Sequence, residues 1–288
     1  MADQLKINPL RKYLRKEKLP HFFCAGCGCG QVLNYYIQAL DELHMDPEQM
    51  LHIGGVGCTA RIPIYIKTDM FHGVHGRTLA WATGVKMMRP ELPVVIFAGD
   101  GDLVSIGGNH MIQSCRRNLD VTVVMVNNMN FAMTGGQVAP TTPEESRTMT
   151  TPYGSGEPRF DVCKLALAAG ATHVERWTTM QPLQCKQAME RALQHKGFSL
   201  IEIVSQCPTH YGRYALKTGD PMKVSGFLLP SRSRAAGWYM AVISTPFFSQ
   251  NCPCSRVILK FSRISSMAAM RPRHTMILGR RSATCRRR

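Results

Sequence analysis

Three cysteines lie close together in the segment CAGCGCG, which runs from Cys24 to Gly30. Thiolates at this spacing could form half of a zinc site, a redox-active dithiol or part of an iron–sulfur cluster site. Two further cysteines, Cys58 in GGVGCTAR and Cys207 in SQCPTHYGR, stand alone after apolar runs. These two lack the paired spacing of a zinc ribbon, and a dithiol would leave them unused, whereas an iron–sulfur cluster needs four thiolates.

Oxygen ligands follow two other apolar runs. The run VVIFAGDGD contains Gly99, Asp100 and Gly101 at its end. About 25 residues later, the run VTVVMVNN ends in Asn127 and Asn128. Glycines let the backbone approach a diphosphate, and a carboxylate binds Mg²⁺, which normally shares its coordination with phosphate. Either fragment alone is a common turn or stop signal, but the two together at this spacing indicate a diphosphate–Mg²⁺ site.

The elements that must position these residues alternate along the chain. Short β-branched runs alternate with stretches of helical periodicity, and this pattern predicts an α/β fold: a mostly parallel sheet with helices on both faces. A long segment rich in Gly, Pro and Thr, 129–158, is predicted to be a functional loop. Strands are predicted within 50–55, 94–100, 121–128 and 199–205, and helices at 31–43, 77–88, 109–118, 161–169 and 182–194.

Charge is unevenly distributed in this chain of 288 residues, whose formal net charge is +16. Positions 222–288 hold 13 Lys or Arg and no Asp or Glu, so positions 1–221 hold 22 basic and 19 acidic residues, a net charge of +3. We therefore expect no specific binding of nucleic acid. Without a signal-like segment or an apolar run long enough to span a bilayer, we expect a cytoplasmic protein with no membrane contact, whose 11 cysteines are thiols or metal ligands.

The order of the motifs resembles the β subunits of the 2-oxoacid:ferredoxin oxidoreductases, and most closely their 2-oxoglutarate branch. The resemblance covers residues 19–221 and implies a thiamine diphosphate-binding fold, because GDG followed by NN is the fingerprint of thiamine diphosphate enzymes. Further motifs stand in the family's order, namely CAGCGCG, GVGCTARIP, FHGVHGRTLAWATGVK, VNNMNFAMTGGQVAPTTP, TTPYG and CPTHYGR.

The resemblance decides between the interpretations of the cysteines. In that family, the cysteines matching Cys24, Cys27, Cys58 and Cys207 bind a [4Fe–4S] cluster. CAGC is then one half of a cluster site. Cys29 stands where the family usually has another residue type, and we expect it to be a free thiol.

The resemblance also implies a Mg²⁺ site and a pocket for thiamine diphosphate. Asp100 and Asn128 would supply side-chain oxygens to Mg²⁺, and Asn130 would supply a backbone carbonyl. Ala132 replaces a glycine of the family in the loop that follows, and it would be strained if the backbone there had a positive φ. The residues expected to bind the cofactor are Gly57, Cys58, Thr59, His75, Gly76, Gly99, Asp100, Gly101, Asp102, Asn128, Asn130 and Thr134.

Two basic side chains are candidates for contact with the substrate. We expect His75, in FHGVHGR, to be catalytic by reaching the diphosphate or the reacting carbonyl, although a hydrogen bond within its loop is the alternative. Arg61 follows the ligand Cys58 and, with Thr59, is the expected substrate contact, because a forked cation suits a dicarboxylic oxoacid. The alternative is that Arg61 pairs with a surface acid or with the partner chain.

The resemblance implies the oxidative decarboxylation of 2-oxoglutarate to succinyl-CoA and CO₂, with coenzyme A as co-substrate and ferredoxin as electron acceptor. The α subunit would supply the glutamate that activates the aminopyrimidine ring, so we expect the isolated chain to be inactive. The alternatives are pyruvate as substrate, or a non-oxidative thiamine diphosphate decarboxylase or synthase. A nucleic-acid-binding protein that uses the basic tail is the alternative from another class.

The resemblance stops where the acid-free segment begins. Residues 224–288 lack an amphipathic period and end in CRRR, whereas the family continues with a helical segment of mixed charge. We predict that this tail is an out-of-frame reading of the gene or a sequencing error, and that it is disordered or poorly packed. Residues 1–223 would then form the cofactor-binding domain.

Overall fold

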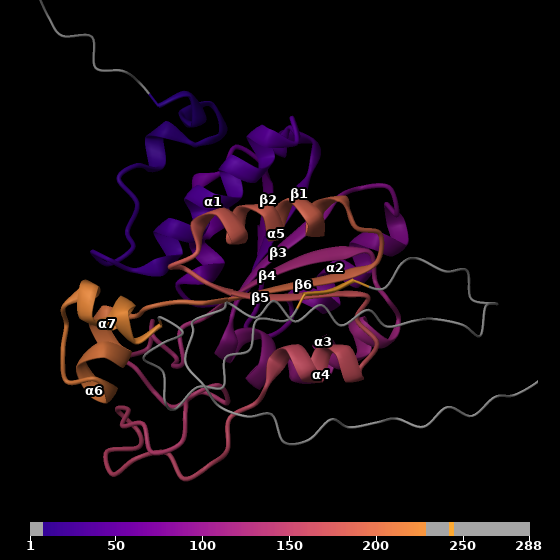
Figure 1. Ribbon diagram of the computed structural model, residues 1–288. Helices are drawn as coiled ribbons and strands as arrows, with labels where there is room; N and C mark the ends of the chain where they lie inside the picture. Colours follow the sequence, from indigo (N-terminus) through magenta and orange to yellow (C-terminus); the bar gives the residue numbers. More distant parts are fainter. Residues whose placement is uncertain (1–7, 229–241, 245–288) are drawn as a thin grey trace, which may run out of the picture.

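A sheet of seven strands lies at the centre of the computed structural model, which describes residues 8–228 and 242–244 (Figure 1). The strand order within this described part is β2-β1-β3-β4-β6-β5-β7. Neighbouring strands pair in parallel, except that β7 is antiparallel to β5. The strands are β1 (Leu51–Gly54), β2 (Asp69–His72), β3 (Val94–Gly99), β4 (Val121–Asn127), β5 (His173–Thr178), β6 (Phe198–Val204) and β7 (Val242–Ser244).

Helices cover both faces of the sheet (Figure 1). The first and fifth helices pack on one face, where Tyr36 and Phe97 are fully buried, and the second, third and fourth pack on the other, around Leu79 and Met111. The helices are α1 (Gly28–Glu42), α2 (Thr78–Met88), α3 (Gly108–Arg116), α4 (Val162–Ala168), α5 (Pro182–Gln194), α6 (Arg213–Ala215) and α7 (Pro221–Phe227). None of the described helices is long and apolar enough to cross a membrane.

Three neighbouring strands end at the same edge of the sheet, and each leads into a polar or glycine-rich segment. Strand β1 leads into residues 55–58, β3 into Asp100, and β4 into the loop of residues 128–160. Open parallel sheets bind ligands at the carboxyl ends of their strands. Short helical segments complete the connections: η1 (Pro9–Tyr13), η2 (Lys16–Lys18), η3 (Pro47–Gln49), η4 (Thr59–Tyr65), η5 (Gly101–Ile106) and η6 (Pro208–Gly212).

The predicted α/β architecture, with a mostly parallel sheet and helices on both faces, is confirmed. Strand β5 was not predicted, because its sequence HVERWT carries charged residues that hide a buried strand. Helix α7 crosses the boundary expected between 223 and 224: Val224 is buried, and Leu228, which follows the helix, is buried in one apolar cluster with Tyr211. The predictions for the rest of the tail lie outside the described residues, apart from the backbone of β7.

Candidate active site

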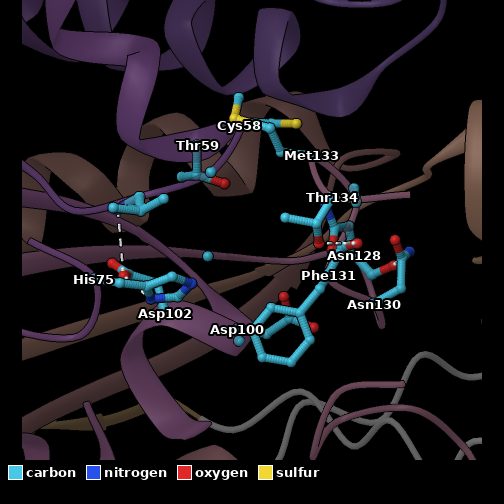
Figure 2. Close-up of a pocket in the computed structure, with 15 residues that line it drawn as sticks. Cys58, Thr59, His75, Asp100, Asp102, Asn128, Asn130, Phe131, Met133 and Thr134 are labelled. Atoms are coloured by element: carbon cyan, nitrogen blue, oxygen red, sulfur yellow. Dashed lines mark hydrogen bonds and ion pairs between the residues drawn. The ribbon is translucent and has the colours of Figure 1, made fainter. Parts of the chain in front are cut away.

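A pocket opens at the carboxyl ends of β1, β3 and β4 (Figure 2). Figure 2 shows Cys58 at one end of it, with His75 and Asp102 on one side and Asn128 and Asn130 on the other. Every residue predicted to bind the cofactor lines this pocket except Gly76. Those that line it are Gly57, Cys58, Thr59, His75, Gly99, Asp100, Gly101, Asp102, Asn128, Asn130 and Thr134.

The three predicted Mg²⁺ ligands lie together. The terminal amide atom of Asn128 that faces them is 3.3 Å from Asp100 Oδ1 and 2.7 Å from the carbonyl oxygen of Asn130. An amide nitrogen at this position donates to both oxygens, whereas the amide oxygen at the same position completes a set of three oxygen ligands. Such a set, with one charge and mixed side-chain and backbone oxygens, is what Mg²⁺ binds, so the residues present fit the ion.

Asp100 is a buried carboxyl group whose ionised form a bound cation would stabilise. It is 2% exposed, and burial raises its pKa to about 7, although the hydroxyl of Thr141, which donates to Asp100 Oδ2, opposes the rise. A bound cation stabilises a buried carboxylate in place of the lost water. Thr141 was not predicted from the sequence, where it was one of two adjacent threonines in the segment APTTP.

Asp102 holds the opposite wall of the pocket. Its Oδ1 accepts hydrogen bonds from Gly76 N over 2.7 Å and from Val56 N over 3.3 Å, and it lies 2.7 Å from His75 Nδ1. Asp102 therefore ties the loops after β1 and β2 to the loop after β3, and Gly76, which does not line the pocket, contributes only this backbone group. One ring nitrogen of His75, Nδ1, faces Asp102, and the other, Nε2, is left for a ligand in the pocket.

Close packing explains two glycines of this site. A Cβ atom on Gly101 would lie 2.3 Å from the ring of Phe131, which lines the pocket. Gly76 has a φ of 71°, and a Cβ atom there would lie 2.6 Å from Gly107 N. Ala132 does not have the positive φ that would strain it. Met129, at the start of the loop, has a positive φ of 62°, which is unfavourable for a residue with a side chain.

The four predicted cluster ligands line a second cavity of about 200 Å³. Cys24 is exposed, Cys27 and Cys58 are half-buried, and Cys207 is buried. Burial raises the pKa of Cys58 to about 12, and the charges of the other three sulfurs add to the rise. The four thiols are thus close enough to interact, but no three His, Cys, Asp or Glu side chains in the described ranges form a ready metal site. The cysteines share a cavity without converging to ligand distances.

Cys29 lies behind this cavity and does not line it. It is fully buried, with its sulfur 3.8 Å from Thr59 Oγ1. A hydrogen bond from Cys29 lowers the pKa of Cys27 to about 7. Cys29 thus lies against two of the predicted cluster ligands without lining their cavity, and its role as a free thiol stays a prediction.

Arg61 lies on η4, directly after the cysteine that lines both cavities, Cys58. The side chain of Arg61 lines neither cavity. The pKa of His72 is lowered mainly by burial of its ring and, to a smaller extent, by the positive charge of Arg61. Within residues 8–228 Arg61 forms no ion pair, so the alternative of a surface acid has no support in this chain. Contact of Arg61 with substrate stays a prediction. Thr59, the other predicted contact, is 2% exposed and lines the pocket.

Several known proteins resemble this chain. Residues 55–203 match the family described as thiamine pyrophosphate enzyme, C-terminal TPP binding domain. The 2-oxoglutarate synthase subunit KorB of Methanocaldococcus jannaschii is 51% identical over 219 residues, which are 75% of this chain and 81% of that protein. The 2-oxoacid:ferredoxin oxidoreductase 2, subunit beta, of Aeropyrum pernix is 39% identical over 188 residues, which are 65% of this chain and 61% of that protein.

A solved structure shows the same relationship. The 2-oxoglutarate:ferredoxin oxidoreductase from Magnetococcus marinus, with 2-oxoglutarate, coenzyme A and succinyl-CoA bound, matches with a TM-score of 0.68 and 36% identity over 72% of this chain and 70% of that one. The family match spans the chain from β2 to the penultimate residue of β6 and includes both Asp100 and Asn128. The chain therefore belongs to the thiamine pyrophosphate enzymes and, among them, to the β-subunit family of the 2-oxoacid:ferredoxin oxidoreductases, in the 2-oxoglutarate branch.

Proposed function

We propose that this chain is the β subunit of an enzyme that converts 2-oxoglutarate, coenzyme A and oxidised ferredoxin to succinyl-CoA, CO₂ and reduced ferredoxin. The identity to a 2-oxoglutarate synthase subunit, 51%, exceeds the 39% identity to a subunit named only for 2-oxoacids, and this favours 2-oxoglutarate over pyruvate. The single observation that carries the proposal is the gathering of Asp100, Asn128 and Asn130 beside a cavity lined by four cysteines.

In the proposed site, Asp100, Asn128 and Asn130 hold Mg²⁺, and the glycines beside Asp100 let a diphosphate approach the backbone. Thiamine diphosphate held by these residues would supply a carbon nucleophile and an electron sink for the decarboxylation of a 2-oxoacid. Asp102 Oδ1 faces His75 Nδ1 over 2.7 Å, and the doubly protonated form of His75, which this carboxylate would stabilise, would donate from Nε2 to the substrate carbonyl or its carboxylate.

The cysteine cavity lies next to the diphosphate pocket, because Cys58, Asn128, Ala132 and Met133 line both. Four thiols around one cavity fit a [4Fe–4S] cluster, which would accept electrons singly and pass them to ferredoxin. The relatives' names as subunits suggest a partner α chain, which we propose supplies the group that activates the aminopyrimidine ring. The isolated chain would then bind cofactors without turnover.

The test is 2-oxoglutarate-dependent reduction of ferredoxin by this chain purified anaerobically with its α subunit. We expect activity that requires coenzyme A, thiamine diphosphate and Mg²⁺, and that prefers 2-oxoglutarate to pyruvate. Reduction of a viologen dye by the isolated chain would contradict the requirement for a partner. A complex that carries no iron but decarboxylates oxoacids would favour a non-oxidative thiamine diphosphate enzyme instead.

A further inference from the structure

Two oppositely charged side chains are buried beneath the loop of residues 128–160, on the face of the sheet that α4 covers. Glu202 of β6 is 0% exposed and Arg176 of β5 is 5% exposed. They are partners in the sheet register, and Arg176 Nε donates to Glu202 Oε2 over 2.6 Å. Neither residue lines the diphosphate pocket. A buried ion pair often stabilises a fold no better than apolar residues of similar size. We therefore looked for a role of the Glu202–Arg176 pair in its hydrogen bonds to other residues.

One side of the pair reaches the start of the loop. Glu202 Oε1 accepts a hydrogen bond of 2.7 Å from Asn127 Nδ2, and Asn127 Oδ1 accepts one of 3.1 Å from Met129 N. Asn127 thereby fixes the turn at Met129, whose positive φ is unfavourable for a side chain of that size. Asn128 stands between these two anchored residues, so the direction of its side chain depends on the turn.

The other side of the pair reaches the end of the loop. Arg176 Nη2 donates to Asp161 Oδ1 over 2.6 Å, and the same carboxylate oxygen caps α4 by accepting from Lys164 N over 3.3 Å. Burial, the largest single influence, would raise the pKa of Asp161, but the hydrogen bond and charge of Arg176, together with Lys164, keep this pKa below its ordinary value. The thiol of Cys163, also on α4, donates to Glu202 Oε2 over 3.1 Å.

Hydrogen bonds inside the loop continue toward the predicted metal ligands. Thr142 Oγ1 donates to the carbonyl oxygen of Met129 over 2.7 Å. Its neighbour Thr141 donates to Asp100 Oδ2. A displaced loop start would therefore move both the Asn128 side and the Asp100 side of the Mg²⁺ site.

We propose that the Glu202–Arg176 pair is a positioning device that joins the two ends of the 128–160 loop and thereby sets the affinity of the pocket for Mg²⁺-bound thiamine diphosphate. The ligand named here rests on the proposed function. Both side chains act through Asn127 and Asp161 and touch no ligand themselves. Residues that orient metal ligands typically change metal affinity about 10- to 100-fold when they are replaced.

The chain offers a matched control in Glu175, the residue before Arg176. Glu175 is also 0% exposed, and it accepts two hydrogen bonds of 2.7 Å from Arg191 and one of 2.7 Å from Trp177. Its partner Arg191 belongs to α5, which covers the opposite face of the sheet (Figure 1). Glu175→Gln therefore weakens the ion pair of an equally buried glutamate, whose partner Arg191 is 42% exposed, without touching the loop.

The experiment compares Glu202→Gln with Glu175→Gln in the complex with the α subunit. Titration calorimetry measures the Kd of thiamine diphosphate at saturating Mg²⁺, and hydrogen–deuterium exchange without the cofactor measures the opening of residues 128–160. We expect Glu202→Gln to raise the Kd about tenfold and to speed exchange in the loop. Glu175→Gln should lower Tm by a similar amount and leave the Kd within about twofold of wild type.

Equal changes in Kd for the two variants, or no change for a folded Glu202→Gln protein, would overturn the proposal. If Glu202→Gln does not fold, Asn127→Ala serves in its place, because it keeps the Glu202–Arg176 ion pair and removes the side chain that links Glu202 to Met129. We expect a higher Kd again, and an unchanged Kd would overturn the proposal. Failure of the wild-type complex to bind thiamine diphosphate would instead contradict the proposed function, and loop exchange would still test the positioning role.

Discussion

The two adjacent cavities differ in how well their side chains are positioned in the absence of a ligand. In the diphosphate pocket, Asp100 and Asn128 are buried and already hydrogen-bonded or in contact with their neighbours. In the cysteine cavity, the four thiols come from three separate segments, Cys24 is exposed, and the sulfurs of the described residues do not form a ready metal site. The first pocket is organised by the ends of parallel strands, whereas the second would depend on the proposed cluster to bring its ligands together.

This difference has a thermodynamic consequence. A site organised before the ligand arrives loses little conformational entropy on binding, whereas ligands on separate segments are ordered by the metal itself. The cofactor pocket should therefore tolerate loss of the cluster, because its ligand oxygens are held by β3, β4 and the loop after β4. Variants that empty one cavity and leave the other intact test this independence.

The largest expected effect is on the cysteine cavity. Cys24→Ser should remove the cluster and reduce ferredoxin reduction to background, because Cys24 lines this cavity and not the diphosphate pocket. Cys29→Ser is the control, since Cys29 lies behind the cavity, and it should retain iron. Iron content and electron transfer measured on both variants decide the assignment; a full cluster in Cys24→Ser would exclude that residue as a ligand.

The next largest effect is expected in the diphosphate pocket. Asp100→Asn removes the only charge among the three predicted Mg²⁺ ligands and should raise the Kd of thiamine diphosphate more than about 100-fold, beyond the effect of outer residues. The iron content should stay at the wild-type level. Cofactor affinity unchanged by this substitution would mean that Mg²⁺ binds elsewhere.

A smaller effect is expected where the two cavities meet, at the segment that follows Cys58. Arg61→Met should raise KM for 2-oxoglutarate about 30-fold, corresponding to a lost charge-assisted contact of about 2 kcal/mol. KM for coenzyme A should not change. If KM for 2-oxoglutarate stays the same while iron and thiamine contents are full, Arg61 does not select the substrate.

The smallest effect concerns one hydrogen bond within the diphosphate pocket. Thr141→Val removes the hydroxyl that donates to Asp100 and should raise the Kd of thiamine diphosphate about fivefold, equivalent to roughly 1 kcal/mol. Thr148→Val is the control: Thr148 is also buried in this loop but bonds to Thr150 and Thr151. Equal affinities of the two variants would show that Thr141 does not support the metal ligand.

The metal-ligand pattern could be predicted from the sequence because strand ends bring distant residues to one edge. Asp100 and Asn128 each follow an apolar run, and parallel pairing of β3 with β4 places them side by side. Strand β5 could not be predicted, because Glu175 and Arg176 look exposed until their partners, Arg191 and Glu202, are known. Hydrophobic patterns reveal burial of apolar residues, whereas burial of a charge depends on a partner that lies far away in the sequence.

Contacts made by the loop after β4 also could not be predicted from the sequence. Thr141 reaches Asp100 only because that loop folds back over the end of β3, and nothing in APTTP distinguishes it from the threonine beside it. Gly76 was expected to bind the cofactor, but its N–H is used by Asp102. Local motifs thus predicted the ligands, and the three-dimensional structure was needed to find the residues that hold them.

The independence of the two cavities is tested most directly by measuring thiamine diphosphate affinity as the cluster is removed. The complex with the α subunit is treated stepwise with an iron chelator under anaerobic conditions, and the Kd is measured at saturating Mg²⁺ for each iron content. The account predicts that electron transfer falls in proportion to iron, while the Kd stays within about threefold of its starting value. A Kd that rises in step with iron loss would contradict it, because the diphosphate pocket would then depend on the cluster for its structure.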